Sequence, residues 1–100
     1  MVRLVKLTLK TEHIQDFMQH FDTVKESINA FPGCKGMKLL TDKNNPQVVF
    51  TYSEWIDDSD LENYRNSELF GSIWPTVKKW FDQKAEAFST EAYFDGFSLK

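Results

Sequence analysis

The order in which the hydrophobic period changes along this chain restricts its fold more than any other feature. Residues 2–9 (VRLVKLTL) alternate and carry apolar side chains on both faces, which is typical of a strand covered on two sides. Between Ile14 and Ile28 the apolar residues instead recur every three or four positions, which predicts an amphipathic helix. Thr11 is the expected N-cap of this helix, and the segment 31–33 (FPG) is expected to end it.

Two further apolar segments follow, separated by a short polar turn. Residues 34–41 (CKGMKLLT) and 48–55 (VVFTYSEW) have the composition of strands, and the second is rich in β-branched and aromatic residues. The turn at 42–47 (DKNNPQ) is too short for a crossover connection. The two strands are therefore expected to form an antiparallel hairpin.

A second helical region begins after the acidic residues 57–60, which supply several possible N-caps for a helix starting near Leu61. Pro75 falls inside this region, and a proline in a helix interior costs about 3 kcal/mol. We therefore expect a break or kink near Trp74 and a fresh helix from Pro75 to about Gln83. Residues 86–94 (EAFSTEAYF) alternate and predict a fourth strand.

The resulting order, βαββαβ, predicts an α+β fold: a ferredoxin-like, four-stranded antiparallel sheet with both helices on one face. We expect a single domain over residues 1–100, with a core of about 2–94. The strand at 48–55 carries Val48, Phe50 and Tyr52 on one face and Val49 and Trp55 on the other, so a sheet covered by helices on one side would expose an apolar patch. Packing against the same face of a second chain would bury this patch, which predicts a homodimer.

Composition excludes several classes of function. The net charge of −3 and the absence of a basic stripe argue against nucleic-acid binding. The lone Cys34 cannot form an internal disulfide, no apolar run approaches a membrane span, and no signal-like segment opens the chain, so a cytoplasmic location is expected. Aromatic residues make up 15% of the chain, which suggests an aromatic pocket or interface.

The two histidines, His13 and His20, lie seven residues apart on the first helix, about 10 Å along its axis. That separation is too large for one metal ion, and no acidic or cysteine cluster completes a ligand set, so no metal site is expected. His20 follows Asp16 by one turn at the border of the apolar stripe. It is either a pocket base oriented by Asp16 or one member of a surface i,i+4 pair.

Aromatic residues of the second helical region are the best pocket candidates. Tyr64 could anchor a substrate hydroxyl and Trp74 could stack on a ring, but both could equally be core or interface aromatics. Trp55 ends the third strand, where a structural role fits better. Cys34 is expected to be a small buried hydrophobe rather than a nucleophile.

Four segments resemble the antibiotic biosynthesis monooxygenase domain family: FPGCKGMKLL, VVFTYSEWID, LENYRNSELF and IWPTVKKWFDQKAEAFSTE. They occur in the family's order and spacing, and the resemblance covers residues 1 to about 94. It implies a dimeric α/β barrel, in which two sheets pack face to face and each sheet encloses a ligand pocket with its own helices.

The resemblance also implies an activity. Known members include monooxygenases that oxidise phenols or quinols without metal or flavin, so we expect no cofactor and a small aromatic, phenolic or quinol substrate. His20 and Tyr64 are the predicted catalytic residues. The predicted substrate-binding residues are Phe17, Phe21, Trp55, Tyr64, Phe70 and Trp74.

Three other functions are compared with the monooxygenase. The haem-degrading relatives use Asn, Trp and His where this chain has Val5, Tyr64 and Trp74, so haem degradation is not expected. RNA-recognition motifs share the βαββαβ order, but VVFTYSEW lacks their basic and glycine-containing pattern. A non-catalytic binding or stress-related barrel module that holds an apolar ligand is the remaining alternative to the monooxygenase.

Overall fold

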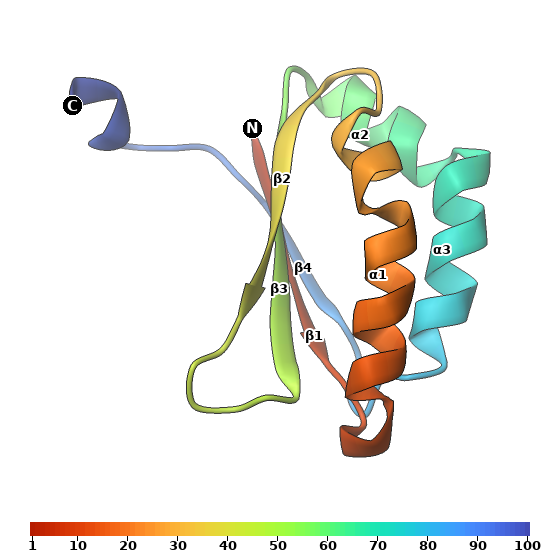
Figure 1. Ribbon diagram of the computed structural model, residues 1–100. Coiled ribbons are helices and arrows are strands. Elements are labelled where there is room, and N and C mark those ends of the chain that lie inside the picture. Colours follow the sequence, from red (N-terminus) through yellow and green to blue (C-terminus); the bar gives the residue numbers. More distant parts are fainter.

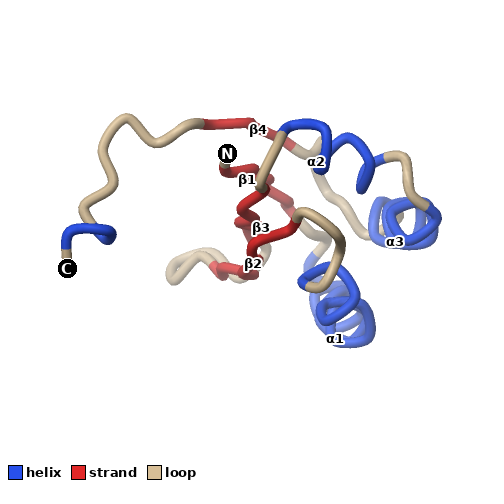
Figure 2. Tube along the Cα trace, turned by 90° about the horizontal axis from the view of Figure 1, so that it is seen from above, coloured by secondary structure: helices blue, strands red, loops and turns tan.

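The computed structural model describes residues 1–100, and its sheet has the strand order β2-β3-β1-β4 with every neighbouring pair antiparallel. The strands are β1 (Val2–Thr8), β2 (Cys34–Thr41), β3 (Val48–Trp55) and β4 (Glu86–Thr90). The helices are α1 (Ile14–Asn29), α2 (Asp58–Arg65) and α3 (Glu68–Lys78), with 3-10 turns at Thr11–His13 and Phe97–Leu99. Both long helices cover the same face of the sheet (Figures 1 and 2). The expected ferredoxin-like α+β fold is confirmed.

The core lies between the helix layer and the inner face of the sheet, meaning the face turned toward the helices. Seven buried apolar side chains form it: Leu7, Leu9, Phe17, Ile28, Val49, Ile73 and Val77. They come from the periodic positions of β1, β3, α1 and α3, with Leu9 just after β1, so the apolar pattern of the sequence is the source of the packing. None of the helices is long and apolar enough to cross a membrane.

The start of the first helix differs from the prediction. Thr11 does not act as an N-cap, because a 3-10 turn at Thr11–His13 precedes α1 and no side chain caps either element. The end of α1 agrees with the prediction. Gly33 has a positive φ of 86°, and a Cβ there would collide with the side chain of Asp60, so the turn into β2 requires glycine.

The predicted break near Trp74 and the predicted helix from Pro75 to Gln83 are both wrong. The second helical region breaks earlier, at Ser67, whose hydroxyl donates to the Tyr64 carbonyl at 2.6 Å and accepts from the Phe70 amide at 3.1 Å. Ser67 thus ends α2 and caps α3, and Pro75 lies inside α3. Burial of Ile73 and Val77 contributes ~1.5–3 kcal/mol each, enough to outweigh the hydrogen bond that proline removes.

The fourth strand is shorter than the predicted 86–94. Thr90 pairs with Val2, the first residue of β1, so the chain beyond Thr90 has no neighbouring strand to pair with. Residues 91–100 leave the body on the side away from the helices (Figures 1 and 2). Large exposed side chains of this segment are Tyr93, Phe94, Phe97 and Leu99.

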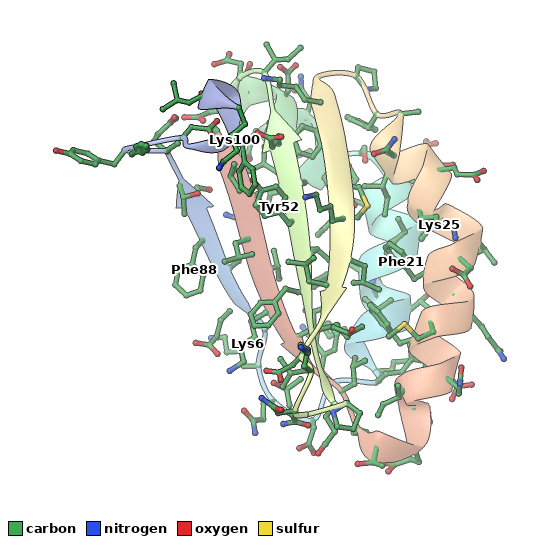
Figure 3. All side chains as sticks on the ribbon, turned by 60° about the vertical axis from the view of Figure 1, so that its left-hand side comes forward. Lys6, Phe21, Lys25, Tyr52, Phe88 and Lys100 are labelled. Atoms are coloured by element: carbon green, nitrogen blue, oxygen red, sulfur yellow. The ribbon has the colours of Figure 1, made fainter.

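The opposite, outer face of the sheet has no helix over it. Leu4 pairs with Tyr52 on one side and with Phe88 on the other, and Leu40 pairs with Phe50. Tyr52 and Phe88 lie on the side of the sheet away from α1 (Figure 3). This face is therefore a continuous surface with large apolar and aromatic side chains, among which Lys38 lies 5.4 Å from the Tyr52 ring centroid.

Candidate functional site

A cavity of about 310 Å³ lies between the inner face of the sheet and the three helices. It is within the size range of small-molecule sites, and twice the ~150 Å³ cavity that accepts a benzene ring. Sixteen of its 21 lining residues are apolar. The exposed residues Arg65 and Ala87 are part of the lining, so the cavity reaches solvent between α2 and β4. Such a chamber suits a small, largely apolar ligand.

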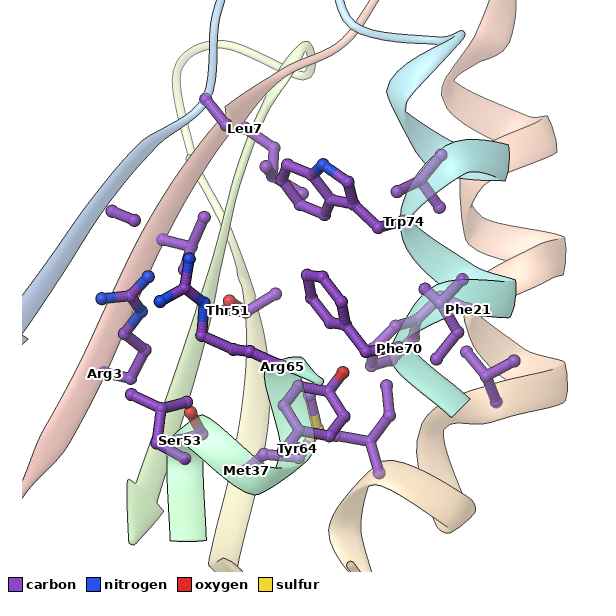
Figure 4. A pocket seen from close by; sticks show the side chains of 18 of the residues that line it. Arg3, Leu7, Phe21, Met37, Thr51, Ser53, Tyr64, Arg65, Phe70 and Trp74 are labelled. Atoms are coloured by element: carbon purple, nitrogen blue, oxygen red, sulfur yellow. The ribbon is translucent and has the colours of Figure 1, made fainter. Parts of the chain in front are cut away.

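The predicted pocket residues all line this cavity. Those from α1 are Phe17, His20 and Phe21, and the others are Trp55, Tyr64, Phe70 and Trp74. Aromatic rings follow one another along the helix side: Tyr64 lies 5.4 Å from Trp55 and 5.3 Å from Phe70, and Phe70 lies 5.6 Å from Trp74 between ring centroids. Figure 4 shows Phe70 and Trp74 projecting from α3 into the cavity. This aromatic wall can stack on a planar ligand.

The hydroxyl of Tyr64 is the most perturbed titratable group of the cavity. Burial, together with a smaller contribution from the nearby Cys34, raises the pKa of Tyr64 from 10.0 to about 12. No group of the chain hydrogen-bonds this hydroxyl. At neutral pH Tyr64 is therefore a protonated, unpartnered O–H group that can donate a hydrogen bond to a ligand but cannot serve as a base.

His20 contributes the second polar group of the cavity. Its Nε2 atom is fully buried and has no hydrogen-bond partner, and its ring packs edge-on against Trp80 at 5.9 Å. The pairing with Asp16 that the sequence suggested is wrong. Asp16 instead contacts Nδ1 of His13 at 2.8 Å, because the carboxylate turns toward the 3-10 turn that precedes α1. His20 thus lines the cavity with an unpartnered Nε2 atom and is not oriented by a carboxylate.

Two arginines of the cavity were missed in the sequence. Arg3 from β1 and Arg65 from α2 both line it, and Figure 4 shows their guanidinium groups on the sheet side, across from Trp74. Burial lowers the pKa of Arg3, and the neighbouring Arg65 charge lowers it further. Two sequence signals pointed here. Arg3 alternates with Val5 on the inner face, and Arg65 follows the buried Leu61 by one helical turn.

Cys34 is a half-buried free thiol beside Tyr64, in place of the buried position expected for it. Nowhere in the chain do three or more His, Cys, Asp or Glu side chains gather closely enough to hold a metal ion. The polar groups that a ligand in the cavity can meet are therefore the His20 imidazole, the Tyr64 hydroxyl, the two guanidinium groups and the Thr51 and Ser53 hydroxyls.

The sheet and the helix layer define a ferredoxin-like domain that encloses a cavity of its own. The sequence model for antibiotic biosynthesis monooxygenases matches residues 1–74. The chain therefore belongs to the antibiotic biosynthesis monooxygenase family, as the resemblance implied. No curated protein matches the chain.

Solved structures carry the same fold over nearly the whole chain. A conserved protein from Methanosarcina mazei is 26% identical and has a TM-score of 0.82, with 87% of each chain covered. A protein from Nitrosomonas europaea described as a candidate antibiotic biosynthesis monooxygenase is 16% identical, with a TM-score of 0.86 and coverage of 93% of this chain and 98% of that one. A protein from Mycobacterium tuberculosis has a TM-score of 0.86 at 9% identity, with coverage of 95% and 96%. These similarities establish the fold and leave the reaction to the residues of the cavity.

Proposed function

We propose that this protein is a cofactor-independent monooxygenase that oxidises a small phenol or quinol with molecular oxygen. The observation that carries the proposal is the buried, unpartnered Nε2 atom of His20 beside an otherwise aromatic cavity whose wall also holds the Tyr64 hydroxyl. Buried polar atoms are almost always hydrogen-bonded, so an orphaned one at a cavity wall indicates that a ligand completes it.

The two groups suit different tasks. Nε2 of His20 can accept the proton of a phenolic hydroxyl, which leaves an electron-rich phenolate. The O–H of Tyr64, protonated at neutral pH, can hold a second oxygen atom of the substrate or the oxygen species formed from it. The aromatic walls exclude water and keep the ring in one plane, which positions it for reaction.

The overall reaction balances without a further reductant. A phenol with a free para C–H bond reacts with one O2 to give a quinone and one water. One oxygen atom enters the ring as the new carbonyl, and the other leaves as water with the two hydrogens that the substrate loses. All the electrons come from the substrate, so the protein has to supply only a base, a hydrogen-bond donor and a dry cavity.

We also propose that the protein works as a homodimer in the cytoplasm, joined through the outer face of the sheet. Leu40, Phe50 and Phe88 lie on this face with no helix to cover them, and Phe88 is 51% exposed. A contiguous apolar surface of this kind is typical of an interface. Face-to-face packing of two such sheets gives the dimeric barrel that the resemblance implies.

The test is oxygen uptake with a panel of phenols and hydroquinones, followed by 18O2 labelling of the product. We expect one labelled oxygen atom in the quinone and one in water. His20→Gln should lower kcat by about 10²–10⁴, the usual contribution of a general base. His13→Gln is the matched control, since His13 lies in the 3-10 turn just before the same helix but does not line the cavity.

Two outcomes would count against the proposal. Unchanged turnover in a folded His20→Gln, Tyr64→Phe double variant would remove the assigned roles. Ligands that raise the melting temperature without any oxygen uptake would favour the other candidate, a binding module, which the apolar lining of the cavity also fits.

A further inference from the structure

The cationic residues of this chain are sorted by type between the cavity and the surface. The sequence contains only two arginines, and both line the cavity. The other ten of the 12 basic residues are lysines, and none of them does. No aspartate or glutamate lines the cavity either, although the chain as a whole has a net charge of −3. The cavity is thus a positively charged chamber in an acidic protein.

The hydrogen-bonding capacity of the two guanidinium groups is largely unused. Each group offers five N–H donors in a planar fork. Arg3 donates from Nη1 to Ser89 Oγ at 3.0 Å, and no carboxylate lies within 4.0 Å of it. Arg65 has only Glu62, at 3.7 Å in a contact where both side chains are about half exposed or more. Most of the donors therefore remain free for a ligand.

The two positive charges also repel each other. Burial and the charge of Arg65 both lower the pKa of Arg3, which means that the charged form of Arg3 is held in an unfavourable place. A partly buried pair of like charges is relieved by a counter-charge placed between them. The carboxylate of Glu62 offsets part of this repulsion, but it forms no ion pair with Arg3, so a group of the ligand is the natural candidate for the remaining counter-charge.

The geometry relates this cationic side to the aromatic wall. Figure 4 shows the guanidinium groups of Arg3 and Arg65 near Thr51, with the rings of Phe70 and Trp74 across the cavity from them. A flat ring stacked on the aromatic wall would carry a substituent toward the arginines. Guanidinium forks match the oxygen spacing of carboxylate and phosphate, whereas a neutral hydroxyl gains much less from them.

We propose that Arg3 and Arg65 bind an oxyanion, a carboxylate or a phosphate, carried by an aromatic ligand whose ring occupies the cavity. This assignment rests on the proposed function in the sense that it names the substrate class for the same cavity. It makes the substrate an acid, such as a hydroxylated aromatic carboxylate, and not a neutral phenol.

The test is binding rather than turnover, with probes that carry no phenolic hydroxyl. We would titrate the protein with 1-naphthoate, 1-naphthyl phosphate and the neutral 1-naphthalenemethanol, following quenching of tryptophan fluorescence, since Trp55 and Trp74 line the cavity. At least one anion should bind about tenfold or more tighter than the alcohol, and added salt should reduce this preference. The anion that binds more tightly shows whether the oxyanion of the natural ligand is a carboxylate or a phosphate.

Substitutions test whether the preference for anions comes from the two arginines. Arg3→Met and Arg65→Met should each remove most of it, while binding of the alcohol stays within about threefold. Lys79→Met is the matched control, because it removes one positive charge from the exposed end of α3. Arg3→Lys keeps the charge without the fork and should recover only part of the preference, which guards against a folding defect in the methionine variant.

The proposal is overturned if the wild-type protein binds the alcohol as tightly as both anions, or if the preference survives in the folded double methionine variant. Its failure and that of the proposed function are separable. Anion preference without oxygen uptake on any phenol leaves the arginine site standing and removes the monooxygenase. Turnover of neutral phenols without anion preference supports the monooxygenase and removes the arginine site.

Discussion

The two faces of the sheet are made of the same strands but are completed in different ways. On β3, Val49 points to the inner face and is fully buried, whereas its neighbour Phe50 points to the outer face and is only half-buried. On β1, Leu7 is 3% exposed under the helices, and Leu4 lies half-buried on the open side. The chain supplies the cover of its inner face, whereas the proposed dimer would supply the cover of its outer face. In that dimer, folding and assembly would use opposite faces of the same strands.

The largest effect is expected from a charge on the outer face. Phe50→Glu would bury a carboxylate in both copies of a face-to-face dimer, at a cost of several kcal/mol for each charge. We expect dimerisation to weaken by more than about a hundredfold, measured by light scattering at decreasing protein concentration. Ser72→Glu adds the same charge on the exposed side of α3 and should leave the dimer intact. A Phe50→Glu protein that remains dimeric would place the interface elsewhere.

A pair of leucine substitutions on β1 compares the faces directly. Leu7→Ala should lower the free energy of unfolding by about 2–5 kcal/mol at any protein concentration, because it empties part of the core. Leu4→Ala should cost less, about 1 kcal/mol, and its effect should depend on protein concentration through the dimer. Urea unfolding at two protein concentrations distinguishes the effects of the two substitutions. Equal losses of unfolding free energy that do not depend on protein concentration would mean that the two faces contribute to stability in the same way.

Alkaline pH gives a smaller effect, confined to the inner face. The pKa of Tyr64 is raised to about 12 in the folded protein from an unfolded value near 10.0. Tyr64 is protonated in both states below pH 10, so its contribution is fully present there. Above that pH the unfolded chain releases the proton first, and the free energy of unfolding falls by roughly 2 kcal/mol as pH approaches 12.

Urea unfolding at about pH 9 and pH 11.5 measures this slope, with the wild type compared against Tyr64→Phe. The Tyr64→Phe variant should lose the slope, and Tyr52→Phe on the outer face should keep it. If both variants kept the slope, the alkaline transition would have a different origin than the burial of Tyr64.

The fold was predictable because its elements have distinct hydrophobic periods. The stripe from Ile14 to Ile28 predicts α1 and the two-residue alternation predicts the strands, since each pattern arises from the packing it produces. The errors occurred where a local signal competed with a distant contact. Pro75 breaks an isolated helix, but burial of Ile73 and Val77 holds α3 together. Strand β4 ends at Thr90 because β1 begins at Val2, a limit set by another segment.

The sequence predicted the types of residue in the site better than it predicted which side chains contact one another. Aromatic composition and position indicated Tyr64 and Trp74, but only the folded chain brings them against His20 and Arg3. Asp16 could reach either histidine, one turn before it or one turn after, and the sequence does not decide between them. Arg3 was missed in the sequence, although its alternation with Val5 already places it on the inner face.

The confinement of both arginines to the cavity has a practical consequence for chemical labelling. A dicarbonyl reagent that modifies guanidinium groups and spares lysine has only two targets in this chain, and both lie in the cavity wall. A bulky adduct at Arg3 or Arg65 would occupy the chamber itself, so the extent of modification reads out how full the chamber is. A reagent of this kind can therefore screen mixtures of natural compounds for an occupant, because only a molecule that shields the two side chains slows the labelling.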